Sequence, residues 1–320
     1  MANKERLYWT NALIFLVGGL LFTSFLVPFI NKTDEWIPLL SGFIETDVFY
    51  SNKYLLAVGG ILSITVLAIS IYFVNSKALD NTFRVYYTQL FFLLIVLANP
   101  TSIYFSTIYP AAILLTWMQF YFIIKQRFIA FFLISIASLF YAPIIWIIPI
   151  VLIISLIGIP DILREFFKSL GGIIIPYLYV FVFRHIYFND VDVFIQQYIN
   201  EITTINFPIY SLSFTTMFLL LCFFIIYIHA TVALLKKINR QSINMGYILR
   251  IELIASLLAI LIFFIFWGNK STPLCVILAC PFSIILSNYV TANKQSYPLR
   301  VELILLMSAV VIARIAYFIN

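Results

Sequence analysis

Long apolar stretches constrain the fold of this chain more than any other sequence feature. Between Asn11 and Ile319 they recur in lengths of about 14 to 25 residues, separated by short polar segments. A helix needs roughly 20 apolar residues to cross about 30 Å of hydrocarbon, and it satisfies its backbone hydrogen bonds internally. Because 63% of the residues are hydrophobic and 10% are charged, a water-soluble domain is excluded. The pattern predicts an all-α, polytopic transmembrane helix bundle, with one domain over residues 1–320.

About eleven spans are expected, with nine or ten as the alternatives. The predicted segments are 11–30, 54–74, 85–98, 103–124, 128–142, 143–159, 170–184, 211–235, 251–267, 274–291 and 301–319. The third is only about 21 Å long at 1.5 Å per residue, and the fifth and sixth are also short. Since short hairpins cannot fill the outer leaflet, we expect a cavity that opens to the outer surface.

Basic residues are unevenly divided by this topology. With the N-terminus in the cytoplasm, fourteen of the 19 Lys and Arg residues fall in inner segments and four fall outside, namely Lys32, Lys53, Arg184 and Lys270. This asymmetry follows the positive-inside rule. It predicts a multi-pass protein of the cytoplasmic (inner) membrane, surrounded by membrane lipids. Because the basic residues are spread over several loops, no nucleic-acid partner is expected. Arg314, inside the last span, is expected to snorkel to the surface.

The first long outer segment, residues 31–53, carries an adjacent pair of acids. Asp34 and Glu35 follow the first span directly. A carboxylate at a membrane surface can act as a general base towards an acceptor hydroxyl, and a second one can bind a divalent metal. The alternative is a solvated acidic loop. We treat Asp34 and Glu35 as the candidate catalytic residues.

The second long outer segment, residues 185–210, begins beside a pair of basic side chains. Arg184 and His185 end the seventh span, and Asp190 and Asp192 follow within a few residues. An arginine fork and a histidine can hold a phosphate group together. These four residues form the candidate substrate-binding set. The alternative is an interfacial anchor at headgroup depth.

Two short sequence features lie near the predicted cytoplasmic surface. Tyr247–Leu253 is repeated fifty residues later as Tyr297–Leu303, with an Arg and a Glu at the same positions in both copies. Either each Arg snorkels while each Glu faces the positive helix end, or the two copies share a lipid-headgroup site or an ancient duplication.

No zinc or nucleotide motif is present, and no metal ligands are assigned. His229, within an apolar span, is expected to be a packing residue.

Three features together resemble the C-type membrane glycosyltransferases, the GT-C superfamily. They are the acids of the first outer loop, the short paired middle helices, and a central stretch with Phe128–Pro143, Arg164-Glu165 and Leu170–Tyr177. The chain also looks like an uncharacterised polytopic membrane protein family of Bacteroidetes, over most of its length. The GT-C likeness covers mainly residues 1–190. It implies a GT-C-like core, a catalytic base at Asp34 or Glu35, and a polyprenyl-phosphate-linked sugar in an outward cavity.

The leading hypothesis is therefore a GT-C-like glycosyltransferase at the outer face of the cytoplasmic membrane. In this reading Asp34 deprotonates or orients the acceptor, Glu35 assists or binds a divalent metal, and Arg184 with His185 holds the donor phosphate. The main alternative is a non-catalytic membrane subunit or scaffold of an envelope assembly or secretion system, bound to a membrane protein partner. A transporter is the third hypothesis. It is ranked last because transporters normally place polar or charged groups at the membrane midplane, whereas these spans carry few charges away from their ends.

Overall fold

The computed structural model describes residues 2–30, 53–78, 82–156, 161–203, 214–238, 243–265, 274–292 and 297–319. These residues form helices joined by short turns, with no strand among them. The helices are α1 (Ala2–Ile30), α3 (Lys53–Ala78), α4 (Thr82–Ala98), η2 (Pro100–Ile103), α5 (Ile108–Ile123), α6 (Arg127–Phe140), η3 (Ala142–Trp146), α7 (Ile147–Leu156), α8 (Ile162–Tyr187), α9 (Val191–Thr203), α10 (Phe214–Ile238), α11 (Ile243–Ile265), α12 (Leu274–Ala292) and α13 (Tyr297–Ile319).

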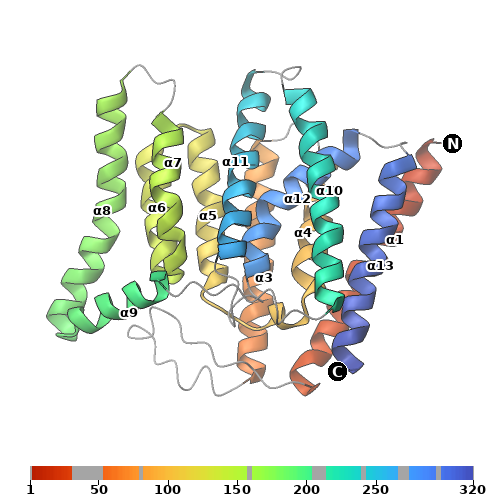
Figure 1. Ribbon diagram of the computed structural model, residues 1–320, viewed down its shortest axis with the longest axis horizontal. Coiled ribbons are helices and arrows are strands. Elements are labelled where there is room, and N and C mark those ends of the chain that lie inside the picture. Colours follow the sequence, from red (N-terminus) through yellow and green to blue (C-terminus); the bar gives the residue numbers. More distant parts are fainter. Residues whose placement is uncertain are drawn as a thin grey trace.

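Most of the helices run side by side along a common direction (Figure 1). Helix α8 forms one edge of the molecule, α1 and α13 form the opposite edge, and α9 lies across the lower end. Every predicted span contains a helix. Within the described residues, three helical stretches are long and apolar enough to cross a membrane: Tyr54–Ser76, Ile162–Tyr187 and Met217–Lys236. The fold is therefore all-helical and membrane-associated, whereas the count of eleven spans stays a prediction.

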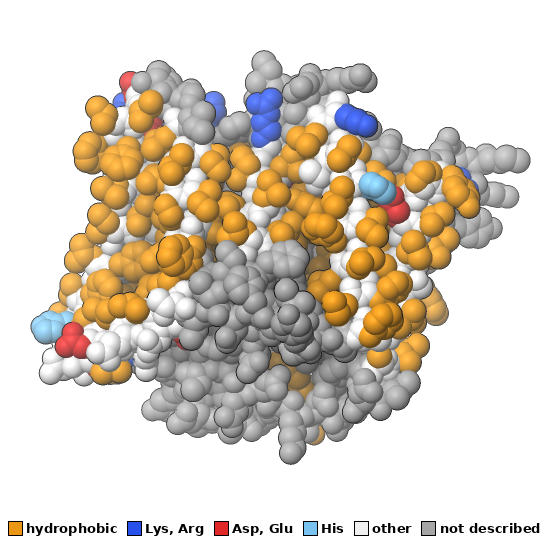
Figure 2. Space-filling view, in the orientation of Figure 1, with side chains coloured by type: hydrophobic (Ala, Val, Ile, Leu, Met, Phe, Trp, Pro, Cys, Tyr) orange, Lys and Arg blue, Asp and Glu red, His pale blue; other side chains and the backbone are white. Residues whose placement is uncertain are grey.

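The surface of the bundle has the charge pattern of a membrane protein. Figure 2 shows hydrophobic side chains over the flank of the molecule, and most of the visible Lys and Arg side chains lie along its upper edge. Large apolar side chains such as Tyr179 on α8 and Phe15 on α1 are exposed. Water would penalise such a flank, whereas lipid tails would cover it at no cost.

The centre of the bundle is built around α4 and α12, which pack against each other. Phe91 and Phe92 of α4 are fully buried, and every residue of α12 from 281 to 290 is buried. Thr88 donates a hydrogen bond to Ser287 across this contact, at 2.8 Å. Small hydroxyl side chains let two helices approach closely and tie them together where no water is available.

Arg314 corrects one expectation from the sequence. Its side chain is 4% exposed and does not snorkel. It donates hydrogen bonds to the Thr23 and Ser24 hydroxyls at 3.1 and 2.5 Å and to the Leu20 carbonyl at 3.3 Å. The guanidinium therefore joins α13 to α1 inside the bundle, because oxygen atoms of α1 replace the water that a charged group needs.

Two glycines allow close helix contacts that any side chain would prevent. A Cβ on Gly172 of α8 would lie 2.5 Å from the Phe128 carbonyl oxygen of α6, and a Cβ on Gly60 of α3 would lie 1.8 Å from the Ile103 carbonyl oxygen. Both neighbours are backbone atoms, so neither can rotate away. The Gly172 contact fixes the distance between α6 and α8, which border the site described next.

Candidate functional site

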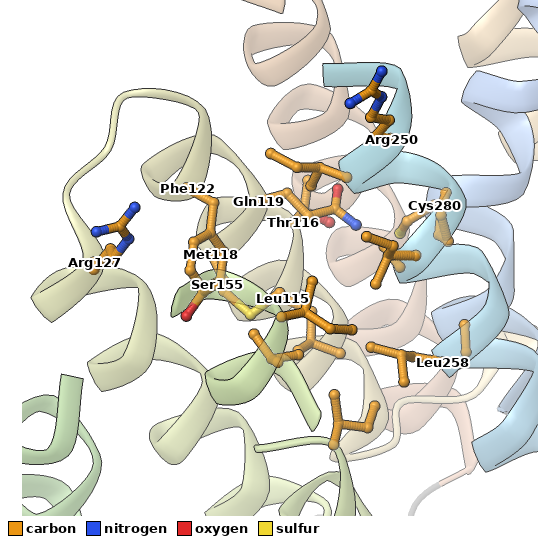
Figure 3. Close-up of a pocket in the computed structure, with 18 of the residues that line it drawn as sticks. Leu115, Thr116, Met118, Gln119, Phe122, Arg127, Ser155, Arg250, Leu258 and Cys280 are labelled. Carbon is orange, nitrogen blue, oxygen red and sulfur yellow. The ribbon is translucent and has the colours of Figure 1, made fainter. Parts of the chain in front are cut away.

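A pocket of about 880 Å³ lies between α5, α7, α11 and α12, with the first residues of α8 at its mouth. In Figure 3, Arg250 lies at the upper right, Arg127 at the left, and Leu258 at the right below the centre of the view. The mouth lies at the end of the bundle where α8 begins, which the predicted topology places in the cytoplasm. The cavity that the sequence predicts at the outer surface stays a prediction.

Helical periodicity explains which side chains line the pocket. On α11 the lining residues are Arg250, Ile251, Ile254, Ala255, Leu258 and Ala259, which recur every three to four positions. On α5, Ala112, Leu115, Thr116, Gln119 and Phe122 follow the same spacing. Since residues three and four apart share one face of a helix, each helix presents a continuous stripe to the pocket. These stripes are mostly apolar, so the body of the pocket suits a hydrocarbon chain.

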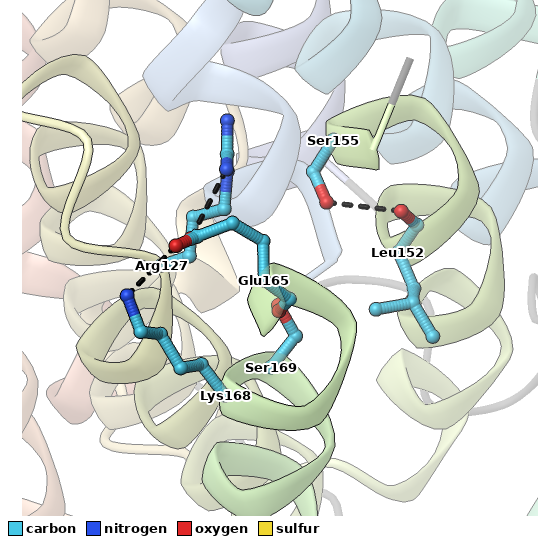
Figure 4. A network of polar contacts seen from close by, with 6 residues as sticks. All are labelled: Arg127, Leu152, Ser155, Glu165, Lys168 and Ser169. Atoms are coloured by element: carbon cyan, nitrogen blue, oxygen red, sulfur yellow. Dashed lines mark hydrogen bonds and ion pairs between the residues drawn. The ribbon is translucent and has the colours of Figure 1, made fainter. Parts of the chain in front are cut away.

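A network of ion pairs closes one side of the mouth. The Glu165 carboxylate accepts from Arg127 at 3.1 Å and from Lys168 at 2.7 Å, and its own side chain is 17% exposed. Figure 4 shows these contacts between the start of α6 and the start of α8. Because two cations share one carboxylate, the network keeps a net positive charge.

Two further cations face the mouth. Lys125 and Arg250 both line the pocket and are exposed, and neither takes part in the salt bridges found among the described residues. Lys125 has a φ of 60° in the turn between α5 and α6, a left-handed conformation that few residues other than Gly, Asn and Asp adopt easily. Asp161 is the second acid of the mouth. The mouth is therefore basic overall.

Polar groups also occur deep in the wall of the pocket. Gln119 is 4% exposed, and its Oε1 atom has no hydrogen-bond partner among the described residues. Thr116 and Cys280 lie in the same wall. Pro281 also lines the pocket and has no N–H, so the carbonyl of Ile277, one turn earlier, lacks its usual helical donor. The wall thus offers hydrogen-bonding groups below the basic mouth.

The structure does not test the residues predicted for catalysis. Asp34 and Glu35 lie outside the described residues, as does almost all of the segment 31–53. Within the described residues, no group of three or more His, Cys, Asp or Glu side chains could hold a metal ion. The catalytic role of the two acids and a divalent metal beside them stay predictions.

The predicted substrate-binding residues lie at the corner between α8 and α9. Arg184 is 5% exposed and makes a two-pronged ion pair with Asp190, with contacts of 3.0 and 3.2 Å. Its guanidinium also stacks 4.7 Å from the ring of Phe194. His185 and Asp192 are exposed beside this pair. A phosphate at Arg184 would have to displace Asp190, so the arrangement is suited to holding α9 against α8.

Helix α9 itself was not expected, because residues 185–210 were predicted to form a long loop. The helix occupies Val191–Thr203 within that segment. Its residues Phe194, Tyr198 and Ile202 belong to a small core beneath it, with Val180 of α8. Their spacing of four residues is a helical signal that the topology-based prediction overlooked. An amphipathic helix that lies across the end of a bundle is typical of a membrane interface.

A second ionisable cluster joins α10, α12 and α13. The buried carboxylate of Glu302 contacts the His229 Nδ1 atom at 2.6 Å and accepts a hydrogen bond from the Tyr289 hydroxyl at 3.0 Å. The His229 side chain is 56% exposed, and its contact with Glu302 joins α10 to α13, as expected of a residue that helps to pack the helices. Glu302 belongs to the repeated Arg-Glu motif. In the other copy Arg250 reaches the pocket mouth, while Glu252 is 1% exposed.

Comparison with known proteins gives a family without an assigned function. No curated protein and no solved structure matches the chain. One family model matches residues 102–319, the part of the chain that contains the described residues lining the pocket. The match covers about two thirds of the sequence, so the chain belongs to DUF6427, a family of unknown function.

Proposed function

We propose that this protein binds an amphiphile with an anionic headgroup, which enters the pocket from the cytoplasmic leaflet of the membrane. The observation that carries the proposal is the pairing of an apolar pocket body with a basic mouth, where Lys125 and Arg250 are exposed and Arg127 is tied to Glu165. A hydrocarbon chain binds favourably in an apolar cavity because its surface is removed from water. A phosphate or carboxylate group is stabilised by contact with Lys and Arg at the membrane surface.

Binding of this kind fits a membrane subunit that carries or senses a lipid, and it fits an enzyme that modifies one. Sugar transfer from a polyprenyl-phosphate carrier at the outer face stays a separate hypothesis. Its proposed acids, Asp34 and Glu35, lie outside the described residues, and its proposed phosphate ligand, Arg184, is paired with Asp190. The pocket therefore favours lipid binding as the activity to test first.

The test is a lipid titration of the purified full chain in detergent, followed by native mass spectrometry. The probes are dioleoyl phosphatidic acid and the neutral dioleoyl glycerol. Wild-type protein should bind the phosphatidic acid more tightly. The double variant Lys125→Asn/Arg250→Gln should weaken that binding by about 5- to 30-fold, if each exposed contact contributes roughly 0.5–1 kcal/mol. Asn is chosen at 125 because it tolerates the left-handed backbone there.

The matched control is Lys236→Gln, which removes an exposed cation of α10 that does not line the pocket. It should leave the affinity unchanged. Equal affinity for the two lipids, or equal losses in the control and the double variant, would contradict the proposal. Inorganic phosphate at millimolar concentration should not displace the lipid, because it cannot fill the apolar body. Displacement of the lipid by phosphate would mean that the site recognises only the anionic group and not the hydrocarbon chains.

A further inference from the structure

The polar wall of the pocket narrows the class of lipid that fits it, and this inference rests on the proposed lipid binding. Thr116 donates its hydroxyl hydrogen to the Ala112 carbonyl at 2.8 Å, and Cys280 donates to the Val276 carbonyl at 3.6 Å. Both donors are therefore used within their own helices. Gln119 differs, because its buried Oε1 atom has no hydrogen-bond partner among the described residues.

A buried amide atom without a partner is costly. Leaving one unsatisfied costs about 1–3 kcal/mol, and the low exposure of Gln119 leaves little room for bulk water. Rotation about the last side-chain bond exchanges the oxygen and the NH2 group of the amide. Gln119 can therefore turn either an acceptor or two donors towards a molecule in the pocket. Because Gln119 lines the pocket, rotation of its side chain would bring the amide to a ligand with a hydrogen-bonding group at this depth, and that hydrogen bond would remove the cost.

The position of Gln119 on α5 sets that depth. It lies four residues before the helix ends at Ile123, which is about 6 Å along the axis. Lys125 follows two residues after that end. Figure 3 shows Gln119 in the wall between Arg250 above and Leu258 below. A ligand whose anionic group sits among the cations of the mouth would present to Gln119 the atoms just below that group.

Lipid classes differ in what they carry at this depth. A diacyl phospholipid has ester carbonyls one glycerol unit below its phosphate, and an amide-linked lipid has a carbonyl and an N–H there. A polyprenyl phosphate has hydrocarbon directly below its phosphate. We propose that the pocket selects an acyl lipid with an anionic headgroup over a polyprenyl phosphate, and that Gln119 is the residue that makes the selection by hydrogen bonding to the acyl linkage.

The experiment compares three probes on the full chain: dioleoyl phosphatidic acid, its dialkyl ether counterpart, and a polyprenyl phosphate. The first two share headgroup and chain length and differ only in the carbonyls. Wild-type protein should bind the diacyl form about 5- to 10-fold more tightly than the ether form, which is the effect of one hydrogen bond. The polyprenyl phosphate should bind no more tightly than the ether form.

The variant Gln119→Met keeps the length of the side chain and removes its polar atoms. It should bring the ratio of diacyl to ether affinity close to one, and it should leave or raise thermal stability because an unsatisfied polar atom is lost. Gln196→Met on the exposed face of α9 is the control and should keep the wild-type ratio.

The outcomes separate the two proposals. If all three lipids need Lys125 and Arg250 but bind equally, or if Gln119→Met keeps the discrimination, the selection is overturned and lipid binding stands. Tighter binding of the polyprenyl phosphate would overturn the selection in the same way. If no probe depends on Lys125 and Arg250, the proposed function itself is overturned.

Discussion

The contact at Gly172 gives the most direct test of the helix packing that shapes the pocket. An alanine there would place its Cβ 2.5 Å from the Phe128 carbonyl oxygen and 3.1 Å from the Phe132 backbone nitrogen. Backbone atoms of α6 cannot rotate aside, so α8 must shift outwards. Overpacking of this kind costs about 1–3 kcal/mol. It should lower the unfolding temperature by roughly 2–10 °C in a chain of this size.

The adjacent residue supplies the control. A Cβ on Gly171 would meet only the Phe128 Cε2 atom at 3.6 Å, an ordinary contact. Gly171→Ala should therefore be neutral or slightly stabilising, since alanine favours the helical conformation. A thiol-reactive dye provides the assay, because Cys222 and Cys280 are buried and become reactive when the bundle opens. Equal unfolding temperatures for the two variants would refute the close α6–α8 contact.

Two further predictions concern the ion pairs away from the pocket. Arg184→Gln leaves Asp190 without its two-pronged partner, so we expect the free energy of unfolding to fall by about 1–3 kcal/mol and proteolysis next to α9 to become faster. The control Asp192→Asn, on the exposed side, should change neither. Equal effects of the two variants would contradict a structural role for Arg184. Replacing His229 and Glu302 by leucine, singly and together, should reveal a coupling energy of about 0.5–3 kcal/mol in thermal unfolding, because the two side chains are 2.6 Å apart. Strictly additive losses of stability would show that they do not interact.

The helices were predictable because the rule that identifies them is local. A run of apolar residues long enough to cross hydrocarbon needs no knowledge of its neighbours, and each predicted span does contain a helix. The 3₁₀ turn η3 between α6 and α7 coincides with the expected break at Pro143. Helix α9 was missed because residues 185–210 were judged from their position between spans and not from their periodicity.

The pocket could not be predicted in the same way. Its walls join residues from Ala112 to Pro281, and only the packing of α5, α7, α11 and α12 brings them together. Two residues were visible as signals in the sequence, the Arg of the repeated motif at 250 and the polar Gln119 within an apolar span. Neither clue names a partner, because both residue types also serve to anchor or join helices.

Arg184 and Asp190 illustrate a different difficulty. The sequence placed them near each other and suggested a phosphate site. The structure pairs them with each other at 3.0 Å beside Phe194. Opposite charges six residues apart can recruit a ligand or neutralise one another, and only the direction of the side chains distinguishes these cases.

The most direct test of the account is an experimental structure of the protein in lipid nanodiscs that contain phosphatidic acid. We expect elongated density in the pocket, with the phosphate between Lys125 and Arg250, the acyl linkage beside Gln119, and hydrocarbon extending towards Leu258. A pocket closed by the surrounding side chains, or a lipid held with its headgroup at the opposite end, would contradict the proposed function.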